Sequence, residues 1–268
     1  MNVSVPRTTA SQIVARAVPH PEAVVHPEAI RLVCFPHAGG GPTAYRGWPA
    51  GLAPHIELWN ATMPGRGRRR GEPPARGWDQ LVASFAAAIA AETPPPYALF
   101  GHSLGALVAF EVARCLTVAG VPPTHLFVSG RAAPGRREPS AVPPTDDELI
   151  SYVDRCYGGI PAAVRAVPEL MEHFVPLLRA DLELAASYQF QPGPSLPVTM
   201  TALAGDRDPA APAGGVSAWA GQAGAGFETH VFPGGHFFLH DQQQAVLRLV
   251  RRRLTATQRE RHQDDRAV

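Results

Sequence analysis

The sequence predicts an α/β fold with a mostly parallel central sheet and helices on both faces. Short apolar segments alternate with helical patterns along most of the 268 residues, which is typical of βα units. Hydrophobic residues make up 45% of the chain and charged residues 18%, which is enough to form a large core. The alternation breaks after residue 130 and strands resume near residue 197, which indicates a helical insertion above the sheet.

The charge balance argues against nucleic acid or a membrane as the main partner. The formal net charge is +1, and all 24 cationic residues are arginine. No apolar run approaches the roughly 18–20 residues that span a bilayer. Three scattered cysteines, Cys34, Cys115 and Cys156, are too few for a disulfide framework or a zinc site. We therefore expect a reduced, cytoplasmic protein.

Local patterns predict the elements of the first half. Residues 1–28 are expected to form a flexible tail. Strands are expected at residues 31–35, 57–63, 97–100 and 124–129, each followed by a turn. Asp79 can cap a helix that ends before Pro94, and residues 104–116 form a second, mostly apolar helix. The apolar residues of the first of these helices share one face: Leu81, Val82, Phe85, Ala86 and Ile89.

The insertion, or lid, covers about residues 131–192. Thr145 and Glu148 have the spacing of a capping box, which predicts a helix to about residue 153. Pro168 opens a longer helix to about residue 188, and Pro176 should kink it. Strands return at 197–204 and 228–232, and a final helix covers 242–254. The prediction is one domain over residues 29–254, followed by a charged tail over 255–268.

One segment, Gly101-His-Ser-Leu-Gly105, indicates nucleophilic chemistry. A G-x-S-x-G match is weak by itself, since a glycine turn with a surface serine would also give it. Here an apolar strand precedes the motif and a helix follows, which is the setting of a strained nucleophile turn. The two glycines allow neighbouring elements to approach closely. Ser103 is therefore the candidate nucleophile.

A serine nucleophile needs a base, and the base an acid that orients it. In this kind of fold the acid and then the histidine follow the serine in the chain. His236 is the candidate base because it lies on a loop after Pro233-Gly-Gly235, whereas His230 falls in a strand, His240 begins a helix and His262 lies in the tail. Asp206 and Asp208 both follow the strand at 197–204. Asp208, just before Pro209, is favoured; Asp206 stays open, with turn capping as its other role.

Acyl chemistry also needs N–H donors for a tetrahedral oxyanion. The backbone N–H of Leu104, next after the nucleophile, is one candidate. The second is expected in the loop His37-Ala-Gly-Gly40, with Ala38 preferred. This loop lacks the Lys-Ser/Thr of a P-loop and the spacing of a dinucleotide-binding motif, which argues against the alternative of a phosphate cradle.

Five segments together resemble the type II thioesterases, the stand-alone editing enzymes of polyketide and non-ribosomal peptide assembly lines. They are Phe35-Pro-His-Ala-Gly-Gly40, Pro64-Gly-Arg-Gly67 with Glu72-Pro73, Gly101-His-Ser-Leu-Gly105, Arg179-Ala-Asp181 and Gly235-His-Phe-Phe-Leu239. The resemblance runs from about residue 31 to 254. It implies an α/β-hydrolase fold with a helical lid, a triad of Ser103, Asp208 and His236, and oxyanion donors at Ala38 and Leu104. The chain departs from the family at residues 140–144, where a His-x-Leu stretch is common.

The resemblance implies hydrolysis of acyl groups from the phosphopantetheine arm of carrier proteins through an acyl-serine intermediate. No metal or organic cofactor is expected, and the protein is expected to be a monomer. Arg66, Arg68, Arg69 and Arg70 could meet an acidic carrier or the arm's phosphate, or form a solvated loop. Phe174, Leu177 and Leu178 could line an acyl pocket or pack in the core. Two alternatives remain, a free-standing serine esterase or lipase and a non-catalytic binding module.

Overall fold

A seven-stranded sheet forms the centre of the molecule in the computed structural model, which describes residues 8–17, 25–135 and 141–264. The strand order is β1-β3-β2-β4-β5-β6-β7, parallel throughout except that β1 runs antiparallel to β3. The strands are β1 Val14–Arg16, β2 Ile30–Phe35, β3 Ile56–Ala61, β4 Tyr97–His102, β5 His125–Ser129, β6 Thr199–Gly205 and β7 Gly226–Phe232. All six strands predicted from the sequence are confirmed, with ends shifted by two residues at most.

Helices cover both faces of the sheet, because alternate residues of each strand point to opposite sides. In β2, Val33 and Phe35 pack into one core, whereas Leu32 and Cys34 pack into the other. The first core is covered by α1 Ala10–Ile13, α3 Trp78–Glu92, α4 Leu104–Val118, α8 Ala213–Ser217 and the short 3₁₀ helix η2 Ala218–Gln222. The second is covered by α2 Trp48–Leu52, α9 Phe238–Asp241 and α10 Gln243–Asp264.

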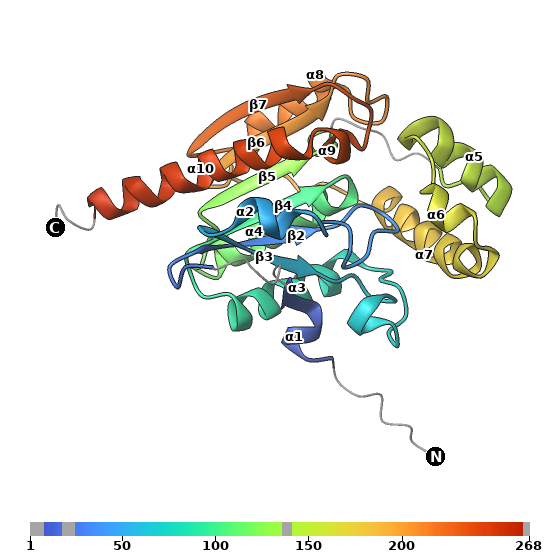
Figure 1. Ribbon diagram of the computed structural model, residues 1–268, viewed down its shortest axis with the longest axis horizontal. Coiled ribbons are helices and arrows are strands. Elements are labelled where there is room, and N and C mark those ends of the chain that lie inside the picture. The colour runs from blue at the N-terminus through green and yellow to red at the C-terminus, as the bar shows by residue number, and fades with distance from the viewer. Residues whose placement is uncertain (1–7, 18–24, 136–140, 265–268) are drawn as a thin grey trace, which may run out of the picture.

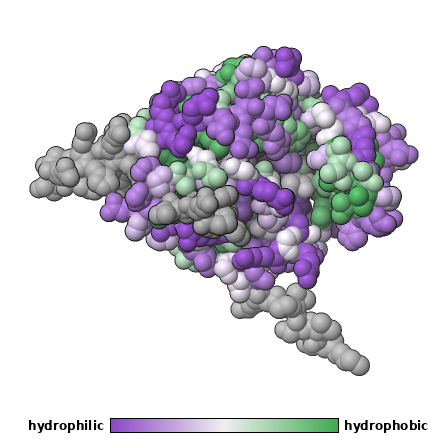
Figure 2. All heavy atoms as spheres, in the orientation of Figure 1, coloured by the Kyte–Doolittle hydropathy of each residue, from purple (hydrophilic) through white to green (hydrophobic). Residues whose placement is uncertain are grey.

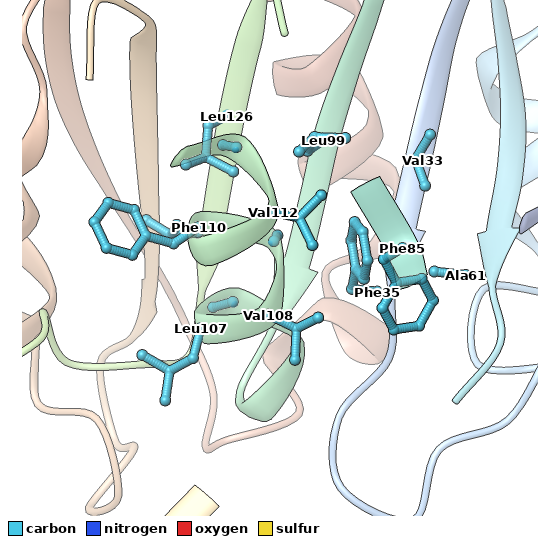
Figure 3. Packing of buried hydrophobic residues seen from close by; sticks show 14 of the residues in the cluster. Val33, Phe35, Ala61, Phe85, Leu99, Leu107, Val108, Phe110, Val112 and Leu126 are labelled. Atoms are coloured by element: carbon cyan, nitrogen blue, oxygen red, sulfur yellow. The ribbon is translucent and has the colours of Figure 1, made fainter. Parts of the chain in front are cut away.

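The helix α4 anchors the first core against the middle of the sheet. Val108 and Val112 point from this helix toward Phe35 and Phe85 (Figure 3), and Leu107 is buried in the same cluster. Beside them, the rings of Phe35 on β2 and Phe85 on α3 meet edge to face, with centroids 5.2 Å apart. Such dense packing fixes the end of β4, where the candidate nucleophile lies, because a close-packed core transmits any displacement to its neighbours.

Three helices lie between β5 and β6: α5 Asp146–Tyr157, α6 Ala162–Arg165 and α7 Pro168–Ala186. They group on one side of the sheet, far from the end of α10 (Figure 1).

The predicted capping box is confirmed, since the Thr145 hydroxyl accepts from the Glu148 N–H at 3.3 Å and the Glu148 carboxylate accepts from the Thr145 N–H at 3.2 Å. An apolar patch gathers over α6 and the start of α7, where Val167 and Leu170 are exposed (Figure 2).

The expectation of a flexible tail over residues 1–28 is wrong for residues 10–16, which form α1 and β1. Ile13 and Val14 are buried in the first core, and Val14 pairs with Ala61 of β3. These contacts come from residues distant in the chain, so the short segment carries too weak a local pattern to reveal them. Within the described residues, no helix combines the length and hydropathy needed to span a membrane.

Two helix ends also differ from the prediction. The helix α3 begins at Trp78 after Gly77, so Asp79 lies in its first turn and does not cap it. The helix α10 continues to Asp264, past the predicted end at residue 254. The parts of the predicted tails and lid at residues 1–7, 18–24, 136–140 and 265–268 lie outside the described residues.

Candidate active site

Ser103 occupies the sharp turn between β4 and α4. Its φ of 58° and ψ of −117° make it the sole non-glycine residue with positive φ in the part of the chain that the structure describes. Such a backbone costs about 1–3 kcal/mol and persists only where the surroundings enforce it. The Ser103 N–H donates to the Ser129 carbonyl at 2.8 Å, which helps to hold the turn.

The two glycines of the motif are required by close backbone approach, as the sequence predicts. A Cβ on Gly101 would lie 2.1 Å from the Gly105 carbonyl oxygen, and a Cβ on Gly105 would lie 2.2 Å from the Phe35 carbonyl oxygen. Any side chain at either position would collide with backbone that cannot move aside. The first turn of α4 therefore packs directly against the ends of β4 and β2.

His236 and Asp208 meet across the loops that follow β7 and β6. The His236 Nδ1 lies 2.8 Å from the Asp208 Oδ2, and both residues are only 4% exposed. The other carboxylate oxygen of Asp208 accepts the N–H groups of Ala210 at 2.9 Å and Ala211 at 3.2 Å, which fixes the carboxylate plane. The loops can approach because residue 205 is glycine, where a Cβ would lie 2.4 Å from the Gly235 carbonyl oxygen.

Asp206, the alternative acid, has a different partner. Its Oδ1 accepts the Gly234 N–H at 2.8 Å, and its side chain is half exposed. Asp206 therefore supports the loop that carries His236 but makes no bond to the imidazole in the part of the chain that the structure describes. The geometry favours Asp208 as the residue that orients the base.

Ser103, His236 and Ala38 line a single pocket of about 730 Å³ beneath the insertion helices. Phe174 and Leu178 of α7 lie in its wall, as one of the two sequence interpretations expects, whereas Leu177 packs at Gly65. Further apolar side chains from the insertion complete the wall: Val153, Ile160, Val164 and Leu182. The pocket thus joins the candidate nucleophile and base to a surface suited to a hydrocarbon chain.

The two candidate oxyanion donors lie where the sequence places them, Leu104 at the first position of α4 and Ala38 in the loop after β2. The neighbouring amides of that loop are already used: Gly39 N–H donates to Asp181 at 2.7 Å, and Gly40 N–H donates to the His37 carbonyl at 2.9 Å. Among the described residues, the amides of Ala38 and Leu104 donate to no protein acceptor. This is the state that an oxyanion hole requires before substrate arrives.

An ion pair ties the Ala38 loop to the insertion. Arg66 binds Asp181 of α7 with both terminal nitrogens, at 2.7 and 2.8 Å, and donates to the Gly40 carbonyl at 3.1 Å. Asp181 in turn accepts the Gly39 N–H. Both charged side chains are buried, 7% and 2% exposed. Both alternatives for Arg66, contact with a carrier or the arm's phosphate and a solvated loop, are therefore wrong, because its guanidinium is engaged inside the protein.

Asp181 should act as a positioning residue for the Ala38 amide. Asp181→Asn keeps an acceptor for the Gly39 N–H. Asp181→Leu removes this acceptor and leaves the buried Arg66 without a counter-charge. We expect kcat to fall about 10- to 100-fold in the leucine variant and less in the asparagine variant, with KM nearly unchanged, because misplaced donors stabilise the transition state less well.

A trifluoromethyl ketone analogue, which forms a tetrahedral adduct, separates this effect from simple destabilisation. Its inhibition constant should rise in step with the loss of kcat/KM, while binding of a non-hydrolysable thioether stays constant. If both ligands weaken equally, or if only the melting temperature changes, Asp181 is a structural residue alone.

The histidines around the site are held neutral. Burial, and then the positive charges that His236, His240 and Arg66 would present, lower the pKa of His37 to about 3. Burial lowers the pKa of His102 well below its usual range, and neighbouring imidazoles add to the effect. Because His37 and His102 are neutral at physiological pH, neither places a positive charge beside His236.

The buried histidines predict a loss of stability in mild acid. Burial lowers the pKa of His102, and it lowers that of His125, which bonds Thr201 at 2.9 Å, to about 4. Near pH 6.5 these histidines therefore take up protons in the unfolded chain but not in the folded one. The free energy of unfolding is thus highest above that pH and falls as the pH drops below it. Together with His37, whose pKa burial lowers to about 3, three histidines contribute, and we expect an average loss of about 2 kcal/mol per pH unit in urea unfolding between pH 7.5 and 5.5. His125→Gln should reduce this slope by about a third, since it removes one of the three contributing histidines. An unchanged slope would contradict the assignment.

A strained serine after a central parallel strand, with an aspartate and a histidine paired across the loops after β6 and β7, is the arrangement of an α/β-hydrolase. Residues 30–254 match the family model described as "Thioesterase domain". The chain belongs to the thioesterase family and is a thioester hydrolase.

Named relatives support the assignment. The chain is 38% identical over 224 residues to thioesterase PikA5 of Streptomyces venezuelae, covering 81% of this chain and 78% of that protein. It is 34% identical over 230 residues to the gramicidin S biosynthesis protein GrsT of Aneurinibacillus migulanus, with 84% and 89% covered. The solved structure of the type II thioesterase BorB from the borrelidin biosynthetic cluster matches with a TM-score of 0.81 and 34% identity, over 91% of this chain and 98% of that one. The resemblance to type II thioesterases is confirmed.

Proposed function

We propose that this protein hydrolyses acyl groups from the phosphopantetheine arm of carrier proteins and so edits stalled or aberrant chains in polyketide or non-ribosomal peptide synthesis. The family assignment and the names of its relatives support this role. The observation that carries it is the pocket itself, in which Ser103 and His236 face an apolar wall supplied by the insertion helices.

The reaction proceeds in two halves. Ser103 Oγ attacks the thioester carbonyl while His236 Nε2 takes its proton, and Asp208 stabilises the resulting imidazolium through Nδ1. The amides of Ala38 and Leu104 bind the oxyanion. The C–S bond then breaks, the sulfur takes the proton from His236 and leaves as the thiol, and the acyl group remains on Ser103. Because a thiolate is a good leaving group, proton donation matters less here than in ester cleavage.

The second half repeats the same steps with water. His236 removes a proton from a water molecule that attacks the acyl-serine carbonyl, and it returns this proton to Ser103 as the ester bond breaks. The free acid and the original enzyme result. Neither half needs a metal or an organic cofactor.

In this proposal residues 29–254 form the catalytic domain, and residues 131–192 act as a lid whose apolar side chains select the acyl chain. The protein works as a monomer in the cytoplasm. A reducing compartment fits the three cysteines, which are unpaired in the structure: Cys34, Cys115 and Cys156.

A substrate comparison tests the function. Acyl groups on carrier proteins should be hydrolysed at least about 100-fold more efficiently than the same groups as p-nitrophenyl esters, since remote binding energy is spent on orientation. Equal or reversed efficiencies would support a free-standing esterase. A fluorophosphonate should add its mass at Ser103, and Ser103→Ala is the matched control. Failure of the probe to react with folded protein would revive the non-catalytic alternative.

A further inference from the structure

The four arginines of the loop at residues 66–70 fall into two classes, buried and exposed. Arg66 is buried on Asp181, and Arg69 is buried on Glu72, which it contacts at 2.7 Å while donating to the Thr62 carbonyl at 2.9 Å. Arg68 and Arg70 are exposed. Only the second class has its charge available to a partner.

Arg68 lines a second pocket, of about 300 Å³, beside the C-terminal end of β3 and the start of α2. Three arginines and several small polar side chains contribute to its wall: Arg16, Arg46, Arg68, Thr43, Asn60 and Thr62. No acidic side chain lines it in the part of the chain that the structure describes. We refer to it as the arginine pocket.

Two of the three charges in the arginine pocket are uncompensated. Arg16 forms an ion pair with Glu57 at 2.5 Å. Arg68 contacts the neutral carbonyl of Ser11 at 3.5 Å, and Arg46 forms no ion pair within the described residues. This concave site offers the guanidinium groups of Arg46 and Arg68 together with nearby amide and hydroxyl donors. Such a set suits a phosphate group, which accepts several charge-assisted hydrogen bonds at once.

The arginine pocket adjoins the catalytic pocket, because Thr43 lines both. An extended ligand with its carbonyl at Ser103 and its far end among the arginines would have to pass Thr43, the residue that the two pockets share. A phosphopantetheine arm has this form, a long uncharged chain with the thioester at one end and a phosphate at the other. We infer that the arginine pocket binds the phosphate of the phosphopantetheine arm, with Arg46 and Arg68 as its main ligands. This inference rests on the proposed function.

A pair of small substrates tests it directly. The same acyl group is presented on phosphopantetheine and on pantetheine, which lacks the phosphate. Wild-type kcat/KM should favour the phosphorylated substrate by about 10- to 100-fold, mainly through KM, because the phosphate binds equally in ground and transition states. Arg46→Gln and Arg68→Gln should each reduce this preference several-fold, and the double variant should abolish it. Rates on acyl-pantetheine should stay unchanged.

Arg70→Gln is the matched control, since it removes another exposed arginine of the same loop, one that does not line the pocket. It should leave the preference intact. Equal wild-type rates on the two substrates, or a preference that survives the double variant, would overturn the phosphate site while leaving the thioesterase function standing. Hydrolysis of neither substrate, with carrier-bound thioesters also inert, would overturn the proposed function instead.

Discussion

Replacement of Ser103 by alanine should lower kcat for carrier-bound thioesters by about 10⁴- to 10⁶-fold, the loss typical of removing a serine nucleophile. The residue lies on the pocket that also contains His236, and its backbone is held in a conformation that the rest of the fold enforces. Single-turnover hydrolysis followed by mass spectrometry of the carrier measures the effect. Residual activity above about 1% would mean that another group attacks the carbonyl.

The same position should also reveal the strain stored in the turn. With φ at 58°, alanine keeps the unfavourable backbone, whereas glycine relieves it. We expect Ser103→Gly to be about 1 kcal/mol more stable than Ser103→Ala in chemical unfolding, although both are inactive. Equal stability of the two variants would contradict a strained nucleophile turn.

Replacement of Asp208 by asparagine should lower kcat by about 10³- to 10⁴-fold. An asparagine retains an oxygen that can accept the Ala210 and Ala211 amides, so the loop should keep its shape. Its amide group, however, cannot stabilise an imidazolium at His236 and favours the wrong tautomer. Steady-state kinetics with an acyl-carrier substrate, together with circular dichroism and the melting temperature, measure the effect on an intact fold.

Asp206→Asn is the control that separates the two candidate acids. Because Asp206 contacts the Gly234 amide and asparagine can still accept that hydrogen bond, we expect kcat to change less than about threefold. A large loss in this variant with a small one in Asp208→Asn would reverse the assignment.

The main frame of the fold could be predicted because its signals are local. Apolar segments of strand length, a G-x-S-x-G turn between a strand and a helix, and the Thr145–Glu148 capping box each depend on neighbours a few residues away. The edge strand β1 was beyond such reasoning, since it exists only through pairing with β3 and packing of Ile13 against α3 and the core.

The candidate site, too, could be predicted in part from the sequence. The sequence names both Asp206 and Asp208, which only one residue separates, and the approach of the loops at Gly205 decides which carboxylate reaches His236. The roles of the arginines were also hidden, because the partner of Arg66 lies 115 positions further along the chain. The segments Pro64-Gly-Arg-Gly67 and Arg179-Ala-Asp181 both belong to the resemblance to type II thioesterases, but nothing in the sequence alone pairs Arg66 with Asp181.

The Asp181 carboxylate couples the position of α7 to the shape of the loop at residues 37–40. Since one carboxylate holds both Arg66 and the Gly39 amide, any outward swing of α7 would withdraw it from the loop beside the nucleophile. The loop that carries the Ala38 amide would then keep its shape only while the insertion stays closed. The lifetime of the closed state would therefore limit how long the oxyanion donors remain in place.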